Sequence, residues 1–200
     1  IVEKVTFLNV PSFVLLKDKT VEVPGLGKVR FDVAYGGAFY AFVDAKEFGF
    51  KLGVDEHNLL IDYGRKIKNA VMNQFEINHP FEKDLSFLYG TIFVGPPHSA
   101  DAHSSNVCIF AEGEVDRCPT GTGVSARLAI HYARGDIQLG DELTIESIIS
   151  SRFTGKVVEA TRFGPHTAVI PEVEGSAFIT GRHEFLIDPD DPLQKGFVLR

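Results

Sequence analysis

The sequence contains few of the residues that mark several classes of protein. Its 200 residues include no tryptophan, one methionine and two cysteines, Cys108 and Cys118. Two cysteines are too few for a disulfide-stabilised scaffold, and they do not form a C-x-x-C redox motif, so a cytoplasmic location is the simpler expectation. No apolar run is long enough to cross a bilayer, and the first residues do not have the pattern of a signal peptide.

The charge balance also narrows the partners that the chain can have. The net charge is −7, and acidic and basic residues are mixed along the chain, which argues against a phosphate-binding surface for nucleic acid. Hydrophobic residues make up 44% of the chain and include 17 phenylalanines, enough for a sizeable core. Because the chain begins at Ile1 and enters a strand-like pattern at once, we expect a fragment or a processed form of a longer protein.

Strand-like alternation dominates the chain. Residues 20–45 have the pattern of a meander of strands, in which Val21, Val23, Val29, Phe31 and Val33 alternate with polar neighbours, with a turn signal at Pro24 and Gly25. The pair Gly36 and Gly37 indicates a bend or a close approach of two backbones. Further strands are expected at residues 3–10, 85–95, 104–111, 142–149, 155–161 and 166–187.

Two helices are expected among these strands. The first covers about residues 55–75, with apolar residues at helical spacing and Asp55 as its N-cap. The second covers residues 121–134, with Thr120 as the N-cap, and ends at Gly135. No repeat, linker or low-complexity segment divides the chain. We therefore predict one mixed α/β domain over residues 1–187, followed by an acidic, proline-containing tail over residues 188–200.

The segment "DRCPTGTG", residues 116–123, stands directly before the second helix. Glycines at a helix start leave backbone N–H groups uncovered at the positive end of the helix dipole, which suits a small anion such as a carboxylate. A plain capped helix is the alternative, with Asp116 and Arg117 as a surface pair and Cys118 as a small buried side chain. The G-x-G-x-x-A spacing does not indicate a nucleotide, because no strand runs directly into Gly121.

A second polar segment, "HSADAH", offers His98, Asp101 and His103 as metal ligands. The i, i+3, i+5 spacing is loose, and no further histidine or cysteine lies close by in the sequence. A solvated loop is the simpler interpretation. We therefore expect neither a metal nor a cofactor.

Taken together, the motifs resemble those of the proline racemase family. The family includes proline racemases, 4-hydroxyproline epimerases and trans-3-hydroxy-L-proline dehydratases. The strongest match is "DRCPTGTG", which is similar to the family's D-R-S-P-C-G-T-G. The resemblance runs from Ile1 to Arg200 and corresponds to the carboxyl-terminal part of a family member. Other similar segments are "NVPSF" at 9–13, "VPGLG" at 23–27, "AYGG" at 34–37, "FTGKV" at 153–157 and "DPDDPLQKGF" at 188–197.

The resemblance implies a fold and a reaction. The fold would be diaminopimelate-epimerase-like, with each of two domains a curled, mostly antiparallel sheet around a central helix, and the tail from Asp188 would return to the absent amino-terminal domain. The family site has one thiol from each domain on opposite faces of the substrate α-carbon. The second thiol falls on Thr120 here, and the C-G-H-type motif of the first thiol is not found in this chain. We do not assign the missing thiol to Cys118, because side chains two residues apart in a turn rarely point the same way.

With threonine at position 120, this sequence resembles the dehydratases of the family. A hydroxyl is a far weaker acid than a thiol, so Thr120 would not return a proton to the α-carbon, and it would instead hydrogen-bond the leaving 3-hydroxyl. The substrate carboxylate would lie on the amides of Gly121, Thr122 and Gly123, Asp116 would hold the ring nitrogen, and Phe110 would flank the ring. The resemblance implies a hydroxyproline as the small-molecule substrate. A homodimer is possible under this interpretation, and we expect neither a membrane nor a nucleic acid as a partner. The alternatives are a racemase or 4-hydroxyproline epimerase, and a non-catalytic protein that binds an imino acid.

Overall fold

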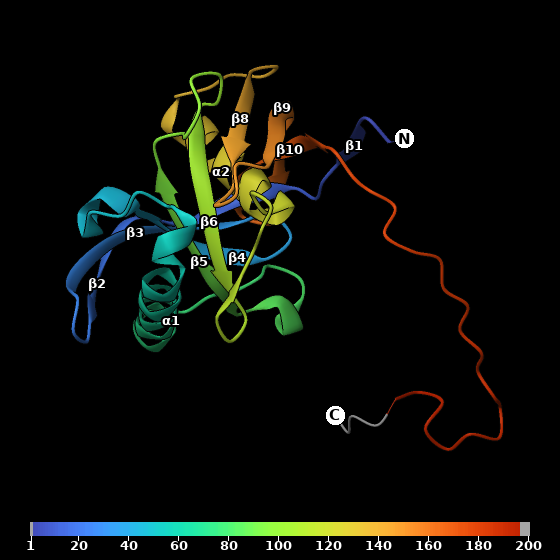
Figure 1. The fold of residues 1–200 in the computed structure, drawn as a ribbon. Helices are drawn as coiled ribbons and strands as arrows, with labels where there is room; N and C mark the ends of the chain where they lie inside the picture. Colours follow the sequence, from blue (N-terminus) through green and yellow to red (C-terminus); the bar gives the residue numbers. More distant parts are fainter. Residues whose placement is uncertain (1, 197–200) are drawn as a thin grey trace.

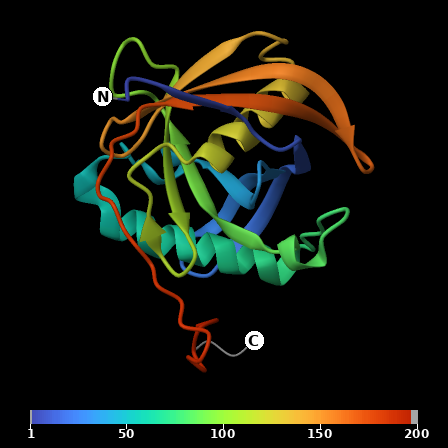
Figure 2. The same cartoon turned by 90° about the vertical axis from the view of Figure 1, so that its right-hand side faces the viewer.

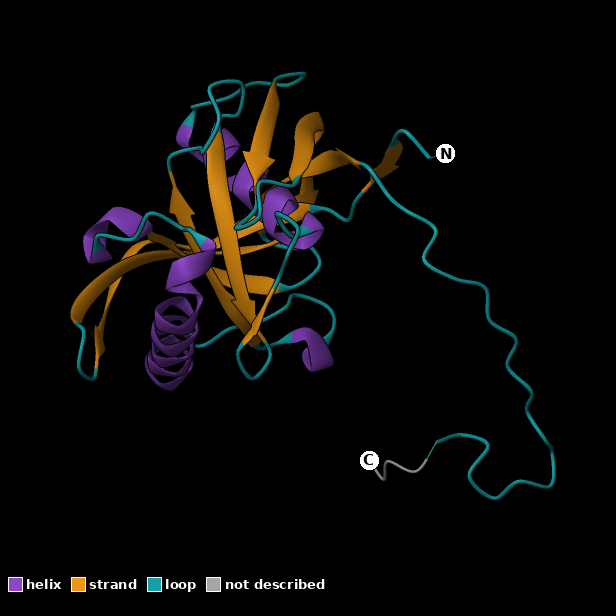
Figure 3. Cartoon of the chain, viewed as in Figure 1, coloured by secondary structure: helices purple, strands orange, loops and turns teal. Residues whose placement is uncertain are grey.

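The chain folds into a closed barrel with one helix inside and one outside. The computed structural model describes residues 2–196. Eight strands close the barrel in the order β10-β2-β3-β4-β5-β6-β8-β9 and back to β10, with β1 added to β10 and β7 to β6 (Figures 1 and 3). The strands are β1 (Val5–Leu8), β2 (Ser12–Val23), β3 (Gly27–Tyr35), β4 (Phe39–Asp44), β5 (Leu88–Gly95), β6 (Ser104–Phe110), β7 (Glu114–Val115), β8 (Glu142–Glu146), β9 (Arg152–Phe163) and β10 (His166–Gly175).

Most neighbouring strands are antiparallel, but the barrel is mixed. The β4–β5 and β6–β8 pairs are parallel, whereas the other pairs of the closed ring are antiparallel. A parallel pair needs a crossover connection, and α1 (His57–Gln74) supplies it between β4 and β5, while α2 (Gly121–Arg134) supplies it between β6 and β8. The remaining helical turns are the short 3₁₀ segments Ala45–Phe48, Val54–Glu56 and Lys83–Leu85.

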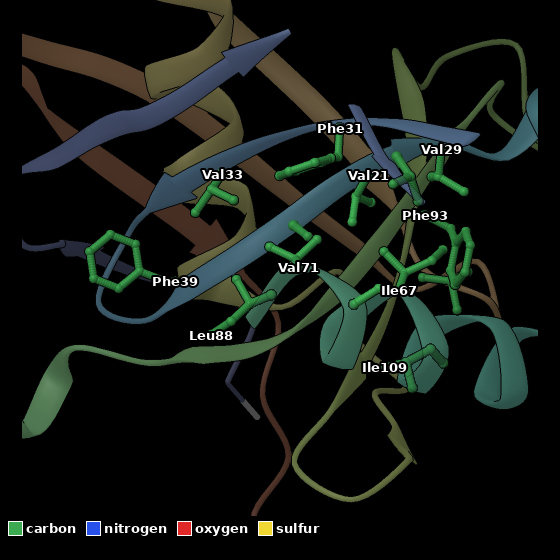
Figure 4. Close-up of a cluster of buried hydrophobic side chains, with 14 of the residues drawn as sticks. Val21, Val29, Phe31, Val33, Phe39, Ile67, Val71, Leu88, Phe93 and Ile109 are labelled. Carbon is green, nitrogen blue, oxygen red and sulfur yellow. The ribbon is translucent and has the colours of Figure 1, made fainter. Parts of the chain in front are cut away.

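The sheet buries both of its faces, which explains the dense apolar pattern of β3 to β6. One face packs against α1 in a cluster that includes Phe31, Ile67 and Ile109 (Figure 4). The other face packs against α2, through residues such as Ala126 and Ile130. Successive side chains of a strand point to opposite faces, so Cys108 joins the α2 cluster while its neighbours join the α1 cluster.

The second helix is the central element of the barrel. Its middle turns are buried, and it contacts β2, β3, β4, β9 and β10 (Figure 2). The helix covers Gly121–Arg134, as predicted, and Gly135 ends it in the left-handed conformation with φ of 79°. The amino-terminal end of α2 is thereby held at one end of the barrel and its carboxyl-terminal end at the other.

Two predictions of local structure are wrong. The helix predicted at about residues 55–75 is α1, His57–Gln74, but Asp55 is not its N-cap: Asp55 lies in a 3₁₀ turn, and the N-cap is Glu56, whose carboxylate accepts from the amides of Lys51 and Leu52, both at 2.8 Å. The last strand ends at Gly175, so residues 176–187 have no strand structure (Figure 1). Apolar composition alone does not make a strand when no neighbouring strand is there to pair with it.

The carboxyl-terminal segment lies away from the barrel and is exposed over its described part, residues 176–196. The strand-like end predicted for the tail falls on residues 197–200, outside the described residues. Within the described chain, neither helix has the length and apolarity that a membrane span requires.

Candidate active site

The segment 116–123 lies at the end of the barrel where α2 begins. It follows β7, and the Asp116 amide donates to the Cys108 carbonyl of β6 at 3.1 Å, which anchors the start of the loop to the barrel. At the other end of the loop, the Val124 amide donates to the Thr120 carbonyl at 2.8 Å as the first bond of the helix. The loop is thus fixed at both ends by the elements that it joins.

Thr120 has an unusual backbone and a buried side chain. Its φ of 68° lies in the region that favours glycine, and its side chain is 7% exposed. Such a conformation costs on the order of 1–3 kcal/mol for a non-glycine residue, so the surroundings must hold it. Thr120 occupies the N-cap position, as predicted, but its hydroxyl makes no capping bond and instead donates to Asp116 Oδ2 at 2.7 Å. The N-cap function predicted from the sequence is therefore wrong.

Asp116 and Cys118 complete a set of short contacts within the loop. The Cys118 amide donates to Asp116 Oδ1 at 3.1 Å, and the Thr120 amide donates to Cys118 Sγ at 3.3 Å. Among residues 2–196 no ion pair joins Asp116 to Arg117, whose side chain is exposed. Burial raises the pKa of the Cys118 thiol to about 11, so at neutral pH it is a protonated thiol and not a base.

The first turn of α2 contacts two other parts of the chain. The Tyr40 hydroxyl lies 2.9 Å from Thr122 Oγ1. Burial raises the pKa of Tyr40, so the phenol stays neutral and able to donate. A Cβ added to Gly36 would lie 2.2 Å from the Thr122 carbonyl oxygen, which confirms the close backbone approach predicted for Gly36 and Gly37. These contacts fix the direction in which the amides of Gly121 and Thr122 point.

Phe110 lies at the carboxyl end of β6, on the same face of the sheet as Cys108. It is partly exposed and its ring centroid is 5.6 Å from that of Tyr89. Cys108 is fully buried, and burial raises its pKa, so this thiol also stays protonated. The structure therefore brings Phe110 into the apolar cluster that also contains Tyr40, beside the start of α2.

The three polar side chains of the segment "HSADAH" are not gathered around one point. Asp101 pairs with Arg152, through Oδ2 and Nη1 at 2.7 Å, and His103 Nδ1 lies 3.0 Å from Ser104 Oγ. The backbone of the loop is held by Glu146, which accepts from the His98 amide at 2.7 Å. No group of three potential metal ligands occurs among the described residues.

Several residues of this region were not predicted as site residues from the sequence. Tyr40 lies 82 residues before Thr122, and Asn9 lies 116 residues before Ser125, to whose Oγ its Nδ2 donates at 2.8 Å. Asn106, whose Nδ2 donates to the Pro119 carbonyl at 3.3 Å, was predicted only as part of a strand. Closure of the barrel brings these distant residues together, and no local spacing reveals it.

One pocket of the chain does not coincide with this region. It has a volume of about 460 Å³ and is lined by residues of the carboxyl-terminal half of α2, including Ile130, His131 and Arg134. It lies at the opposite end of the helix from Thr120, so we assign it no part in the chemistry of the loop.

The fold and the loop define a barrel domain that presents a carboxylate, a hydroxyl and a helix amino terminus at one end. The family model described as proline racemase matches residues 1–198, and the chain therefore belongs to the proline racemase family. Similar proteins include a trans-3-hydroxy-L-proline dehydratase of Colwellia psychrerythraea, 52% identical over 200 residues, and the human trans-3-hydroxy-L-proline dehydratase, 46% identical over 198 residues. The alignments cover 100% and 98% of this chain, and 56% of each relative.

A solved structure supports the same placement. The hydroxyproline epimerase of Agrobacterium vitis with bound trans-4-hydroxy-L-proline is 36% identical and superposes with a TM-score of 0.85. The match covers 98% of this chain and 56% of that one. The chain thus spans little more than half the length of the proteins that it resembles.

Proposed function

We propose that this chain forms one half of the active site of a trans-3-hydroxy-L-proline dehydratase. The observation that carries the proposal is a threonine hydroxyl, 2.7 Å from the Asp116 carboxylate, at the amino terminus of the central helix. The relatives named trans-3-hydroxy-L-proline dehydratase support it, because they match the chain from end to end. In this proposal the other half of the enzyme supplies the thiol base, and no cofactor takes part.

The substrate carboxylate would bind at the start of α2. The first amides of a helix have no acceptor within the helix, and they lie at the positive end of its dipole. Those of Gly121, Thr122 and Gly123 would donate hydrogen bonds to the carboxylate oxygens. Their attraction grows as negative charge spreads from the α-carbon into the carboxylate, so it stabilises the transition state more than the bound substrate.

Asp116 would bind the ammonium of the substrate ring. A carboxylate has about four lone-pair positions, and Asp116 uses two of them on the Thr120 hydroxyl and the Cys118 amide. It therefore keeps the capacity to accept from a ring N–H. Phe110 would cover an apolar face of the ring from β6.

The reaction is a loss of water across the Cα–Cβ bond. The thiolate of the other domain takes the α-proton, the C–H electron pair forms the Cα–Cβ double bond, and the bond from the β-carbon to the 3-hydroxyl breaks. Thr120 would hydrogen-bond that hydroxyl as it leaves. The hydroxide takes up one proton from solvent and the thiol of the other domain returns its proton to solvent, so the net product of the step is one water and one enamine. The enamine formed then tautomerises to 1-pyrroline-2-carboxylate. Reprotonation of the α-carbon from this side would need an acid at position 120, and the Thr120 hydroxyl is a far weaker acid than a thiol.

The test uses a two-domain enzyme that carries this chain as its second half. We expect it to convert trans-3-hydroxy-L-proline to the cyclic imine, followed by proton NMR, and to leave the optical rotation of L-proline unchanged. Racemisation of proline without dehydration would show that the enzyme is a racemase or an epimerase. Tight binding of the imino acid without any turnover would favour the non-catalytic alternative.

This chain of 200 residues alone should have no turnover, because the proposed base lies in the other half. The family resemblance assigns the tail that begins at Asp188, of which the structure describes residues 188–196, to contacts with that half. Four apolar side chains that precede this tail, Phe178, Ile179, Phe185 and Leu186, are 83–89% exposed, and burial against a second domain would account for them. Turnover by the isolated chain at the rate of the two-domain enzyme would refute this division.

A further inference from the structure

A buried polar network contacts the loop formed by residues 116–123. Arg127, on the second turn of α2, is 4% exposed, and its guanidinium donates to Ser104 Oγ at 2.7 Å and to Asn106 Oδ1 at 3.1 Å. Its third contact is His131 Nε2 at 2.9 Å. All three partners are side chains other than carboxylates. The charge of a buried arginine without a carboxylate partner adds little to the stability of the fold. We therefore examine which groups Arg127 orients.

Arg127 determines which way the Asn106 amide faces. A guanidinium has only donors, so the side-chain oxygen of Asn106 must face Arg127 and the NH₂ group must face away. That NH₂ donates to the Pro119 carbonyl at 3.3 Å. Asn106 itself is completely buried on β6, a rigid strand of the barrel.

The Pro119–Thr120 peptide is therefore held on both sides. Asn106 binds its carbonyl, and Cys118 Sγ accepts its N–H at 3.3 Å. In a trans peptide these two groups point in opposite directions, so the two bonds fix the plane of the peptide. This plane, together with the φ of 68° at Thr120, sets the direction of the Thr120 side chain.

We propose that Arg127, acting through Asn106, is a positioning residue that holds the Thr120 hydroxyl in its working orientation. The proposal rests on the proposed function insofar as Thr120 acts on the leaving hydroxyl. Neither residue reaches the substrate in this scheme. The effect should therefore fall on kcat, while carboxylate binding at the start of α2, and with it KM, changes little.

Two variants of Asn106 distinguish an effect on the position of the loop 116–123 from an effect on the stability of the fold. Asn106→Asp keeps an oxygen towards Arg127 and gives it a counter-charge, but the second oxygen faces the Pro119 carbonyl and repels it. Asn106→Leu removes both bonds without adding charge. The matched control is Ser105→Ala on the same strand, because Ser105 Oγ is buried and has no hydrogen-bond partner among the described residues.

The first readout needs no catalysis and uses this chain alone. Cys118 is partly exposed and Cys108 is buried, so iodoacetamide labelling resolved by mass spectrometry reports on Cys118. Release of the loop reduces the burial that raises the Cys118 pKa, and one pKa unit changes the thiolate fraction about tenfold. From this relation we expect Cys118 to be labelled at least about tenfold faster at pH 8 in both Asn106 variants than in the native chain. The melting temperature of Asn106→Asp should not fall, and Ser105→Ala should label at the native rate.

The second readout is the kcat of the two-domain enzyme. We expect a decrease of about tenfold in the Asn106 variants, equivalent to about 1.4 kcal/mol, with KM within about twofold. Arg127→Met should lower kcat less than Asn106→Leu, and the double variant should be no slower than Asn106→Leu, because Arg127 acts through Asn106. Native labelling and native kcat in folded Asn106 variants would overturn the proposal. An unchanged turnover in Thr120→Ala would instead refute the proposed function and leave the labelling result standing.

Discussion

The most direct test of the site is the removal of the Asp116 charge. Asp116→Asn keeps the size of the side chain, but under the proposed function it would leave the ammonium of the substrate ring without a counter-charge in a site that the other domain closes. Truncation of one partner of a buried charge pair costs about 2–5 kcal/mol. We therefore expect kcat/KM of the two-domain enzyme to fall at least about 30-fold, since about 1.4 kcal/mol corresponds to a factor of ten.

The effect on folding should be much smaller. In the native structure the Cys118 amide donates to Asp116 Oδ1 at 3.1 Å, and the side-chain oxygen of an asparagine can accept the same bond. The NH₂ group of the asparagine can donate to the Thr120 hydroxyl. Two charge-assisted hydrogen bonds become neutral ones, which lowers the free energy of unfolding by about 1 kcal/mol. For a chain of this size that is a decrease in melting temperature of about 2–4 °C.

The assay compares Asp116→Asn with Asp62→Asn, which removes an exposed carboxylate paired with Lys66 on α1. The control should keep kcat/KM within about twofold, because exposed pairs contribute less than about 1 kcal/mol. Thermal melts of both variants exclude a folding defect as the cause of a lower rate. A folded Asp116→Asn enzyme with nearly native kcat/KM would refute the ammonium role and leave Asp116 as a ligand of the loop alone.

Three further predictions follow from the structure. Thr120→Cys should introduce racemisation of L-proline, measured by optical rotation, because a second thiol could return the proton from the other face; an unchanged rotation would contradict the assignment of position 120 to the reacting α-carbon. Gly36→Ala places a Cβ 2.2 Å from the Thr122 carbonyl oxygen and should lower the free energy of unfolding by about 1–3 kcal/mol in denaturant titrations, whereas an unchanged midpoint would refute the close contact. Burial, and secondly the Arg127 guanidinium, lower the pKa of His131 to about 4. The free energy of unfolding should therefore be full above about pH 6.5 and decrease by up to about 3 kcal/mol as the pH falls towards 4. His131→Gln should remove this pH dependence, and an equal dependence in the variant would refute the assignment to His131.

Local patterns predicted the elements better than their closure. The period-two alternation of β3 and the glycine at the end of α2 are local signals, and both elements appear where they were predicted. The parallel β4–β5 and β6–β8 pairs and the ring closure through β9–β10 were not predicted in detail, because they depend on partners far apart in sequence. Residues 176–187 were predicted as a strand for the same reason: composition reports the tendency to pair, not the presence of a partner.

The candidate site shows the same division between local and distant information. The segment 116–123 was found from the density of polar residues and glycines in it and from its similarity to the family motif. The direction of the Thr120 hydroxyl was not predicted from the sequence. A threonine directly before a helix ordinarily caps that helix, and the capping geometry requires an extended backbone. Here φ is 68°, and the hydroxyl turns to Asp116. That backbone conformation is unfavourable for threonine in isolation, so it depends on Asn106 and Cys118, which hold the two sides of the preceding peptide. Only one of these two residues lies in the segment, and this is why the segment by itself does not reveal how its central residue is oriented.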